Sequence, residues 1–433
     1  MTRLAFYLDT RALGDIDLSQ PELGNPGVGG SEYMFFLVAA RLARDLEVHL
    51  YAPRLGRFPA GIHYHQVADL AEAAARFRDH GERWVVLRES EIPGNLAALA
   101  AGPAQILAWA HNYSNPKTLR ACLGLPNLAR YVCVSREQYE NLRDERIFPK
   151  CAFVFNAAAA DAYRPGPDGP LGNDVFFMGS IHPQKGFHVL ARNWDAIRRA
   201  VPDARLHIVG SGQLYDRRSV MGPLGIAEAG YERELARHLA RDGKLRDDVV
   251  FHGTLGAGKN DLLRTAKVAV VNPTGQGETF CISALEFELL GVPVVTRDLG
   301  GPRNVVASGR TGILFRREAE LAPAVIRLLQ DESLRSAMAR EAPAFARDRF
   351  DIGPVARAWK ELVQALENGR PPEPDYRLTS AGRLTRAKEC NRRLKALPGL
   401  GWLPSLDCVL HALRKRRHSL LVKPWRRLRA GFQ

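Results

Sequence analysis

Short runs of apolar and β-branched residues alternate along the chain with longer stretches of helical periodicity. This alternation is typical of a parallel sheet covered by helices. In the first half, helices are predicted at 31–44 and 136–143. The strands predicted in that half are 3–8, 47–52, 84–89, 105–111, 131–135 and 151–156. The strands predicted in the second half are 175–180, 204–210, 248–253, 268–273 and 292–296.

The stretch RPGPDGPLGND at 164–174 separates the two series of strands and is typical of an interdomain linker. A chain of 433 residues also exceeds the size at which one core usually keeps growing. We therefore expect an α/β protein of two Rossmann-like, doubly wound domains facing each other across a cleft. The segments expected are a first domain at 1–165, a second at 174–345, a closing helix within 346–369 that crosses back to the first domain, and a tail at 370–433.

The net charge of +14 is concentrated in the tail, where 16 Lys and Arg stand against 4 Asp and Glu. Basic clusters next to Trp402 and Trp425 favour an amphipathic segment on an anionic membrane surface. A solvated tail, or one packed on the body or on a partner subunit, is the alternative. Nucleic-acid binding by this tail is less favoured, because the remaining 369 residues are nearly neutral.

Six scattered cysteines with no CxxC pair indicate reduced thiols in a cytosolic protein. The first residues lack the apolar region of a signal peptide, and no run approaches the ~18 apolar residues of a spanning helix. We expect a cytoplasmic protein, either soluble or peripheral on the inner face of the membrane.

The segment GETFCISALEFELLGVPVV at 277–295 carries carboxylates at Glu278 and Glu286 in a stretch that otherwise predicts a buried helix running into a strand. A buried carboxylate is costly unless it is paired. If the helix starts near Ile282, both acids face one crevice, where carboxylates accept sugar or ribose hydroxyls. Alternatively, Glu278 adds favourable charge at a helix N-terminus and Glu286 lies on a polar face. Glu288 fits that second account.

Other candidates follow predicted strands. Gly29 and Gly30, with Ser31 as an N-cap, suit an anion at a helix N-terminus, although a flexible loop has the same composition. Lys185, in the spacing G-x₅-KG of 179–186, is placed to reach a phosphate, or else is a solvated turn lysine. A lone histidine is more often structural, but His111 follows a strand at the edge where ligands bind in such sheets.

Glu278 and Glu286, spaced E-x₇-E before GVPVV, resemble the donor site of retaining glycosyltransferases of family 4, which have the GT-B fold. Supporting motifs occur in the family's order over some 290 residues. These are the glycine loop, His111, SREQYENL at 135–142, FN at 155–156, G-x₅-KG, IVGSG at 208–212, VVFHGTL at 249–255, NPTGQGET at 272–279, and GG with TGILF at 300–315.

The resemblance implies that the second domain binds a nucleotide-sugar and the first holds a saccharide or lipid-linked acceptor, in cell-surface polysaccharide or glycolipid assembly. Lys185 would hold the diphosphate, with Gly29 and Gly30 approaching it, and Glu286 would bind the ribose. Glu278 would contact the transferred sugar and His111 would lie by the anomeric centre. The backbone segments implied are Gly253, Thr254 and Leu255 near the base, and Thr279, Phe280, Cys281 and Ile282 near the sugar.

Retention of configuration by same-face attack is the expected mechanism, with no cofactor beyond the sugar donor. We expect no metal, because no motif of clustered His and Asp suggests one. Ser180 stands where the family often has an arginine, so a phosphate cation is missing unless His182 or Arg303 replaces it. Thr279 and Cys281 replace common glycines. A non-catalytic sugar-nucleotide binder is therefore an alternative, and an epimerase is a weaker one because its usual acid/base set is not visible.

Overall fold

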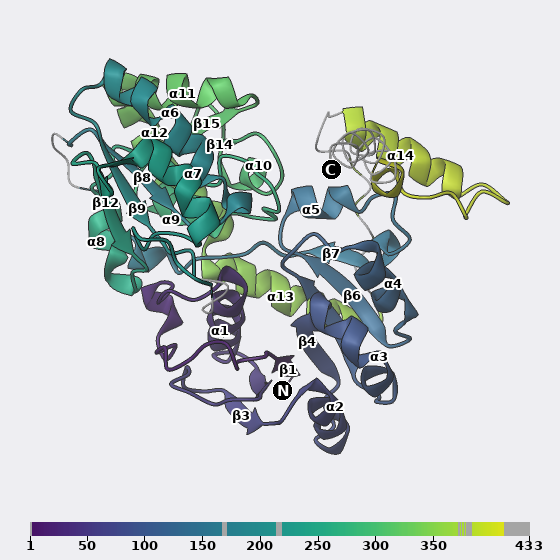
Figure 1. Ribbon diagram of the computed structural model, residues 1–433. Helices are drawn as coiled ribbons and strands as arrows, with labels where there is room; N and C mark the ends of the chain where they lie inside the picture. The colour runs from purple at the N-terminus through teal and green to yellow at the C-terminus, as the bar shows by residue number, and fades with distance from the viewer. Residues whose placement is uncertain are drawn as a thin grey trace, which may run out of the picture.

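The computed structural model describes residues 2–166, 171–213, 219–370, 373, 375, 377 and 383–410. The chain forms two parallel sheets with helices on both faces, the second at upper left and the first at lower right in Figure 1. The predicted pair of doubly wound domains is thereby confirmed.

The first sheet has seven parallel strands in the order β3-β2-β1-β4-β5-β6-β7. Its strands are β1 Arg3–Tyr7, β2 Glu47–Ala52, β3 His63–Gln66, β4 Trp84–Arg88, β5 Gln105–Ala110, β6 Leu128–Cys133 and β7 Cys151–Phe153. Its helices are α1 Gly30–Leu42, α2 Leu70–Asp79, α3 Ile92–Ala100, α4 Pro116–Gly124 and α5 Arg136–Asn141. The edge strand β3 was not predicted, because its sequence HYHQ lacks an apolar run.

The second sheet has six parallel strands in the order β12-β9-β8-β13-β14-β15. Its strands are β8 Asp174–Met178, β9 Arg205–Val209, β12 Val249–Gly253, β13 Val268–Val270, β14 Val294–Arg297 and β15 Gly312–Phe315, with a small hairpin of β10 Ala240–Arg241 and β11 Lys244–Leu245 beside them. Its helices are α6 Phe187–Ala200, α7 Ala229–Leu239, α8 Asn260–Leu263, α9 Ile282–Leu289, α10 Pro302–Val305, α11 Leu321–Gln330 and α12 Glu332–Phe350.

Alternate residues of each strand enter different cores. In β1, Phe6 belongs to a central core and Tyr7 to a core on the other face of the sheet. In β8, Phe176 belongs to the same central core and Phe177 to a third. Burial on both faces explains why these strands are almost continuously apolar. Because the central core contains residues of both sheets, the two domains share packing.

In the part of the chain that the structure describes, the backbone crosses between the domains at two places. After α12 ends at Phe350, α13 Ile352–Glu367 returns to the first domain and lies against α1. Trp359 of α13 packs its ring 4.9 Å from the ring of Trp109 in β5. At the crossing, Ala158 and Asp351 form a parallel bridge. The two crossing segments are thus hydrogen-bonded to each other.

The described part of the tail packs on the first domain. Helix α14, Arg383–Lys395, lies against α5, where Lys388 Nζ donates to the main-chain oxygen of Asn141 at 2.6 Å. Glu389 pairs with the fully buried Arg143 at 3.3 Å. This part of the tail therefore follows the alternative in which it packs on the body of the protein. Residues 411–433, including Trp425, lie outside the described residues, so membrane docking stays a prediction.

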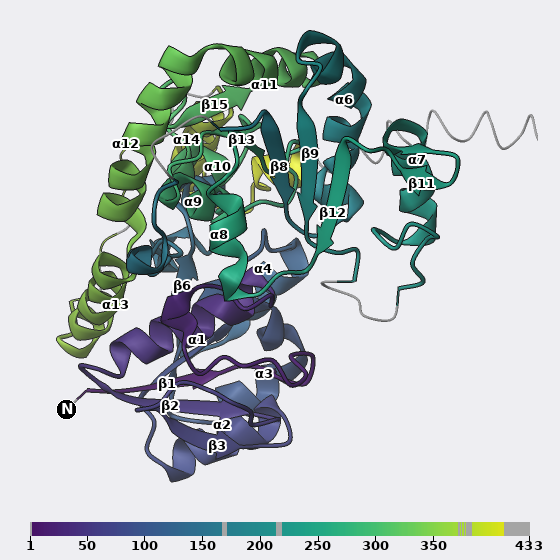
Figure 2. The same ribbon diagram turned by 90° about the vertical axis from the view of Figure 1, so that its left-hand side faces the viewer.

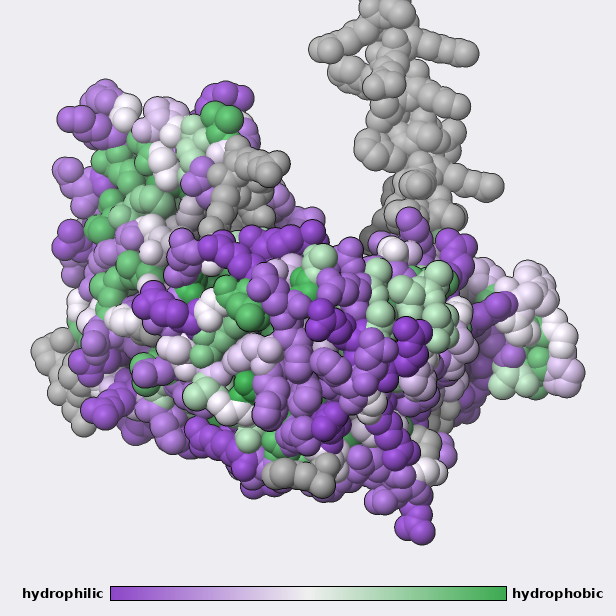
Figure 3. Space-filling model, turned by 90° about the horizontal axis from the view of Figure 1, so that it is seen from below, coloured by the Kyte–Doolittle hydropathy of each residue, from purple (hydrophilic) through white to green (hydrophobic). Residues whose placement is uncertain are grey.

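The face of the molecule seen in Figure 3 is mostly hydrophilic, with hydrophobic residues in small groups. Within the described ranges, no helix combines the length and apolar character needed to cross a bilayer.

Candidate active site

A cavity of about 470 Å³ lies between the domains, at the carboxyl ends of both sheets. Figure 2 shows the domains stacked, with α1 and its preceding loop facing the second domain. Arg88 ends β4 and His111 follows β5 on one wall, while Gly179 follows β8 and Asn272 follows β13 on the other. Ligands of open parallel sheets bind at this edge, so the cavity is the candidate site.

Glu278 lies in the cavity wall and is already paired. Its Oε2 accepts from Lys185 Nζ at 2.7 Å and from Asn272 Nδ2 at 2.9 Å. Burial alone would raise the pKa of Glu278, but the Lys185 ammonium and these hydrogen bonds outweigh it and hold that pKa below its usual value. Glu278 is therefore an anion at neutral pH. Lys185 and Glu278, predicted to serve different parts of one ligand, form a contact.

Glu286 lines the same cavity from α9, as its spacing from Glu278 predicted. Its Oε1 is 2.9 Å from Lys259 Nζ and accepts from the Tyr163 hydroxyl at 2.8 Å. Lys259 also donates to the main-chain oxygen of Asn25 in the glycine loop at 3.2 Å. Lys259 was not predicted. The signal for it was a lysine six residues beyond the end of β12, at the same edge of the sheet.

His111 is 6% exposed and lines the cavity from the first domain. Its ring packs 4.5 Å from the ring of Trp109, and its Nε2 makes no hydrogen bond within the described residues. Burial, with the charge of Arg88, lowers the pKa of His111 to about 3. The imidazole is therefore neutral at pH 7, and its Nε2 is available to a ligand as far as the described residues are concerned.

Two charged residues of the first domain, Arg88 and Glu32, line the cavity and were not predicted. Arg88, the last residue of β4, pairs with Glu32 of α1 at 2.8 Å and with Glu91 at 3.5 Å. Arg88 was read as part of a strand, although a charge at the carboxyl end of a buried strand is itself a signal. Arg88 brings a cation to the wall that carries His111.

The glycine loop brings the domains into contact. A Cβ on Gly27 would lie 3.1 Å from Thr254 Cγ2, and one on Gly30 would lie 3.0 Å from Ile282 Cδ1. Gly30, Thr254, Leu255 and Ile282 line the cavity, whereas Gly29 and Gly253 adjoin it without lining it. The prediction of Ser31 as N-cap is wrong. Because the Gly29 carbonyl already accepts from the Tyr33 N–H, α1 begins at Gly30 with Gly29 as its cap.

Ser180 lines the cavity and is 2% exposed, with an Oγ that has no partner among the described residues. The two cations considered as replacements for an arginine there do not line the cavity. His182 caps the short helix at 183–185, and Arg303 pairs with Asp298 at 2.7 Å. Lys185, Lys259 and Arg88 are the cations found in the described wall.

The loop before α9 holds the remaining predicted residues. Thr279, Phe280 and Cys281 all line the cavity. Thr279 Oγ1 donates to the His111 carbonyl at 2.6 Å, a bond between the domains. Cys281 has φ of 83°, which is rare for a residue with a side chain. This backbone conformation turns the chain from the loop into α9.

The reading of Glu288 as a solvent-facing residue is wrong. Glu288 is fully buried and accepts from Thr311 Oγ1 at 2.5 Å. Helix α12 packs on α9, so α9 has no solvent face at that position. Burial raises the pKa of Glu288 well above its usual value.

Comparison with known proteins agrees with this geometry. Residues 172–331 match the family of glycosyl transferases group 1. Residues 172–331 are thus similar to a glycosyltransferase domain. A phosphatidyl-myo-inositol mannosyltransferase of Mycobacterium leprae is 33% identical over 189 residues, which are 43% of this chain and 45% of the relative. A glycogen synthase of Mycobacterium tuberculosis is 29% identical over 219 residues, 50% of this chain and 47% of the relative. The chain thus spans about half the length of these curated relatives.

Solved structures share the whole two-domain fold. Anabaena Alr3699/HepE in complex with UDP-glucose has a TM-score of 0.65 at 16% identity and covers 84% of this chain and all of its own. The sucrose-phosphate synthase of Thermosynechococcus elongatus has a TM-score of 0.65 at 17% identity, covering 85% of this chain and all of its own. These likenesses establish the GT-B fold.

Proposed function

We propose that the protein is a retaining glycosyltransferase of family 4 that moves a sugar from a nucleotide-sugar to a saccharide or lipid-linked acceptor. The observation that carries this proposal is the pairing of two carboxylates with two lysines in one interdomain cavity, opposite a buried neutral histidine. Hydroxyl-binding acids next to phosphate-binding cations match the chemistry of a sugar diphosphate.

The donor would lie along the wall of the second domain. An ammonium has three N–H donors, so Lys185 can bind a phosphate oxygen and keep its bond to Glu278. Lys259 brings a second ammonium to the same wall, within reach of the glycine loop. Glu286 would accept from the ribose hydroxyls and Glu278 from the sugar. As the donor bond breaks, negative charge grows on the diphosphate, and these fixed cations stabilise that state more than the ground state.

The reaction itself is a substitution at the anomeric carbon. The bond from that carbon to the diphosphate oxygen breaks, and its electron pair stays on the diphosphate. The acceptor oxygen bonds to the same face of the carbon, and its proton passes to the departing phosphate oxygen. His111, neutral and with an Nε2 that has no hydrogen-bond partner among the described residues, would hydrogen-bond a sugar hydroxyl near this carbon.

The cations of the described wall are the basis for proposing metal-independent catalysis, because they can carry the phosphate charge. We also place the enzyme in the cytoplasm, peripheral on the inner face of the membrane, in polysaccharide or glycolipid assembly. The homologue named phosphatidyl-myo-inositol mannosyltransferase supports a lipid-linked acceptor.

A panel of nucleotide-sugars tests the proposal, first by thermal shift and then by donor turnover with and without a chelator. The native protein is compared with Glu278→Gln and with Glu318→Gln, an exposed carboxylate outside the cavity. We expect turnover by the native protein and the control alone, unaffected by chelator, with an anomeric proton signal showing retained configuration in the product. Binding without turnover would make the protein a non-catalytic sugar-nucleotide binder. The observation that favours this alternative is Ser180, which stands where the family often has an arginine. Salt-dependent DNA binding would instead favour the nucleic-acid alternative.

A further inference from the structure

A cluster of histidines and glutamates lies at the amino ends of β2 and β3, the opposite edge of the first sheet from the cavity. Strand pairing places His49 beside His63 and Tyr51 beside His65. Because side chains alternate along a strand, Glu47 and His49 of β2 share one face with His63 and His65 of β3. None of these residues lines the interdomain cavity, and the proposed reaction does not use them.

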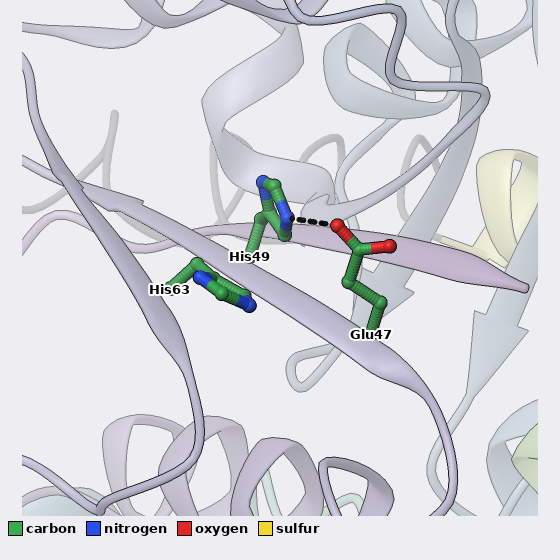
Figure 4. Close-up of side chains that lie close together, drawn as sticks. All are labelled: Glu47, His49 and His63. Atoms are coloured by element: carbon green, nitrogen blue, oxygen red, sulfur yellow. Dashed lines mark hydrogen bonds and ion pairs between the residues drawn. The ribbon is translucent and has the colours of Figure 1, made fainter. Parts of the chain in front are cut away.

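Three of these side chains offer ligand atoms to one point. One nitrogen or oxygen from each of Glu47, His49 and His63 lies within 4.8 Å of the other two. Figure 4 shows the Glu47 carboxylate directed at the His49 ring, with the His63 ring alongside. Glu47 Oε1 is 3.1 Å from His49 Nε2, and the two rings are 4.9 Å apart.

His49 faces a carboxylate through each ring nitrogen. Its Nδ1 is 2.8 Å from Glu82 Oε1 and 3.1 Å from His65 Nε2, and its Nε2 is 3.1 Å from Glu47 Oε1. A neutral imidazole has one N–H, and an ionised carboxylate only accepts. One of the two contacts therefore places two lone pairs together unless a proton or a metal ion lies between them. Arg3 also pairs with Glu47 Oε1, at 2.9 Å. The same oxygen remains 3.1 Å from His49 Nε2.

Glu82 is positioned as an outer-shell partner of His49. It is 1% exposed and accepts from the Tyr51 hydroxyl at 2.8 Å, and its Oε2 has no hydrogen-bond partner among the described residues. A metal-ligating histidine usually donates its second N–H to a carboxylate, which fixes the tautomer and turns the other nitrogen to the metal. The Glu82–His49 contact has this form, with Nε2 left for the ion.

We propose that Glu47, His49 and His63 form a binding site for a divalent transition-metal ion of the Zn²⁺ type. Two imidazoles and one carboxylate are a common Zn²⁺ ligand set, and the exposure of His63 leaves the fourth position to water. The ion would join the four-residue edge strand β3 to β2.

The test is titration of the full-length, untagged protein with ZnCl₂ after treatment with a chelator, followed by calorimetry and by the visible absorption of Co²⁺ in a parallel titration. His63→Ala removes an exposed ligand without disturbing the core, and Gln66→Ala, at the exposed end of the same strand, is its matched control. Glu82→Gln keeps the shape of the outer-shell group and removes its charge.

We expect one tight equivalent in the native protein and in Gln66→Ala, with a melting temperature that rises on adding Zn²⁺. Binding should be at least about tenfold weaker in His63→Ala and roughly 10–100-fold weaker in Glu82→Gln. If the native protein binds no Zn²⁺, or if His63→Ala binds it as tightly, the proposal is overturned and the cluster is a hydrogen-bonded network only. Sugar transfer is measured in a separate assay, so a protein that transfers no sugar would still give an interpretable Zn²⁺ titration.

Discussion

Replacing Lys259 with methionine would leave the Glu286 carboxylate buried without its cation. The two side chains are 6% and 5% exposed, and their charged atoms are 2.9 Å apart. Removing one member of a buried ion pair costs about 3–5 kcal/mol, because the remaining charge stays in a medium that solvates it poorly. The Tyr163 hydroxyl still donates to the same oxygen, and the cavity admits water. We therefore expect a loss near the lower value, about 3 kcal/mol.

Urea unfolding, followed by circular dichroism, measures this loss for Lys259→Met against the native protein. The melting temperature should fall by roughly 6–12 °C if the second domain unfolds as one unit. Lys360→Met is the matched control, since Lys360 pairs with Asp45 at 3.0 Å with both side chains more than a quarter exposed. Exposed pairs contribute no more than about 1 kcal/mol.

The double variant Lys259→Met/Glu286→Gln decides whether the unpaired charge is the cause. With neither charge present, it should be more stable than Lys259→Met alone, by up to about 3 kcal/mol. If Lys259→Met costs less than about 1 kcal/mol, or if the double variant is no more stable, then the buried charge is not the source of the effect. Either variant should also lose the thermal shift with nucleoside diphosphates.

Glu278→Gln should lower transfer turnover by roughly a hundredfold or more with little change in melting temperature; an unchanged rate would remove Glu278 from the proposed mechanism. Burial raises the pKa of Glu89 to about 7, so the stability from its neutral form is complete below about pH 4 and is lost as pH rises through 7. Glu89→Gln should abolish this loss, about 3 kcal/mol in urea titrations from pH 5 to 9, and curves parallel to the native protein would contradict the assignment. Gly301→Ala should reduce donor affinity, measured by calorimetry, because a Cβ there would collide with the Phe280 backbone.

The fold was predictable because burial on both sheet faces gives each central strand a continuous apolar run. The edge strand β3 was not predicted because its sequence, HYHQ, is polar and partly exposed. Glu278 and Glu286 were placed in one cavity by their spacing alone, since both lie on or beside one helix.

The partners of those acids follow a different rule. Lys259 is 27 positions before Glu286, and only the sheet order brings the turn after β12 beside α9. Arg88 lies on the other domain, and its place at the end of β4 does not by itself show that it faces the second domain across the cavity. The burial of Glu288 likewise depends on α12, a helix more than 40 residues further along. Periodicity reports which face of an element is buried against its neighbours, and does not identify the neighbour.

The bridge between Ala158 and Asp351 joins the only two backbone crossings in the described chain. The Ile352 N–H donates to the Ala158 carbonyl at 2.9 Å, and the Ala158 N–H donates to the Phe350 carbonyl at 3.0 Å. The two segments that connect the domains therefore lie side by side and are hydrogen-bonded to each other. An opening of the cavity would have this pair of segments as its axis. Phe280, the residue after Thr279, packs its ring 5.3 Å from the ring of Phe350 at the crossing, so the bond from Thr279 to the His111 carbonyl lies near that axis.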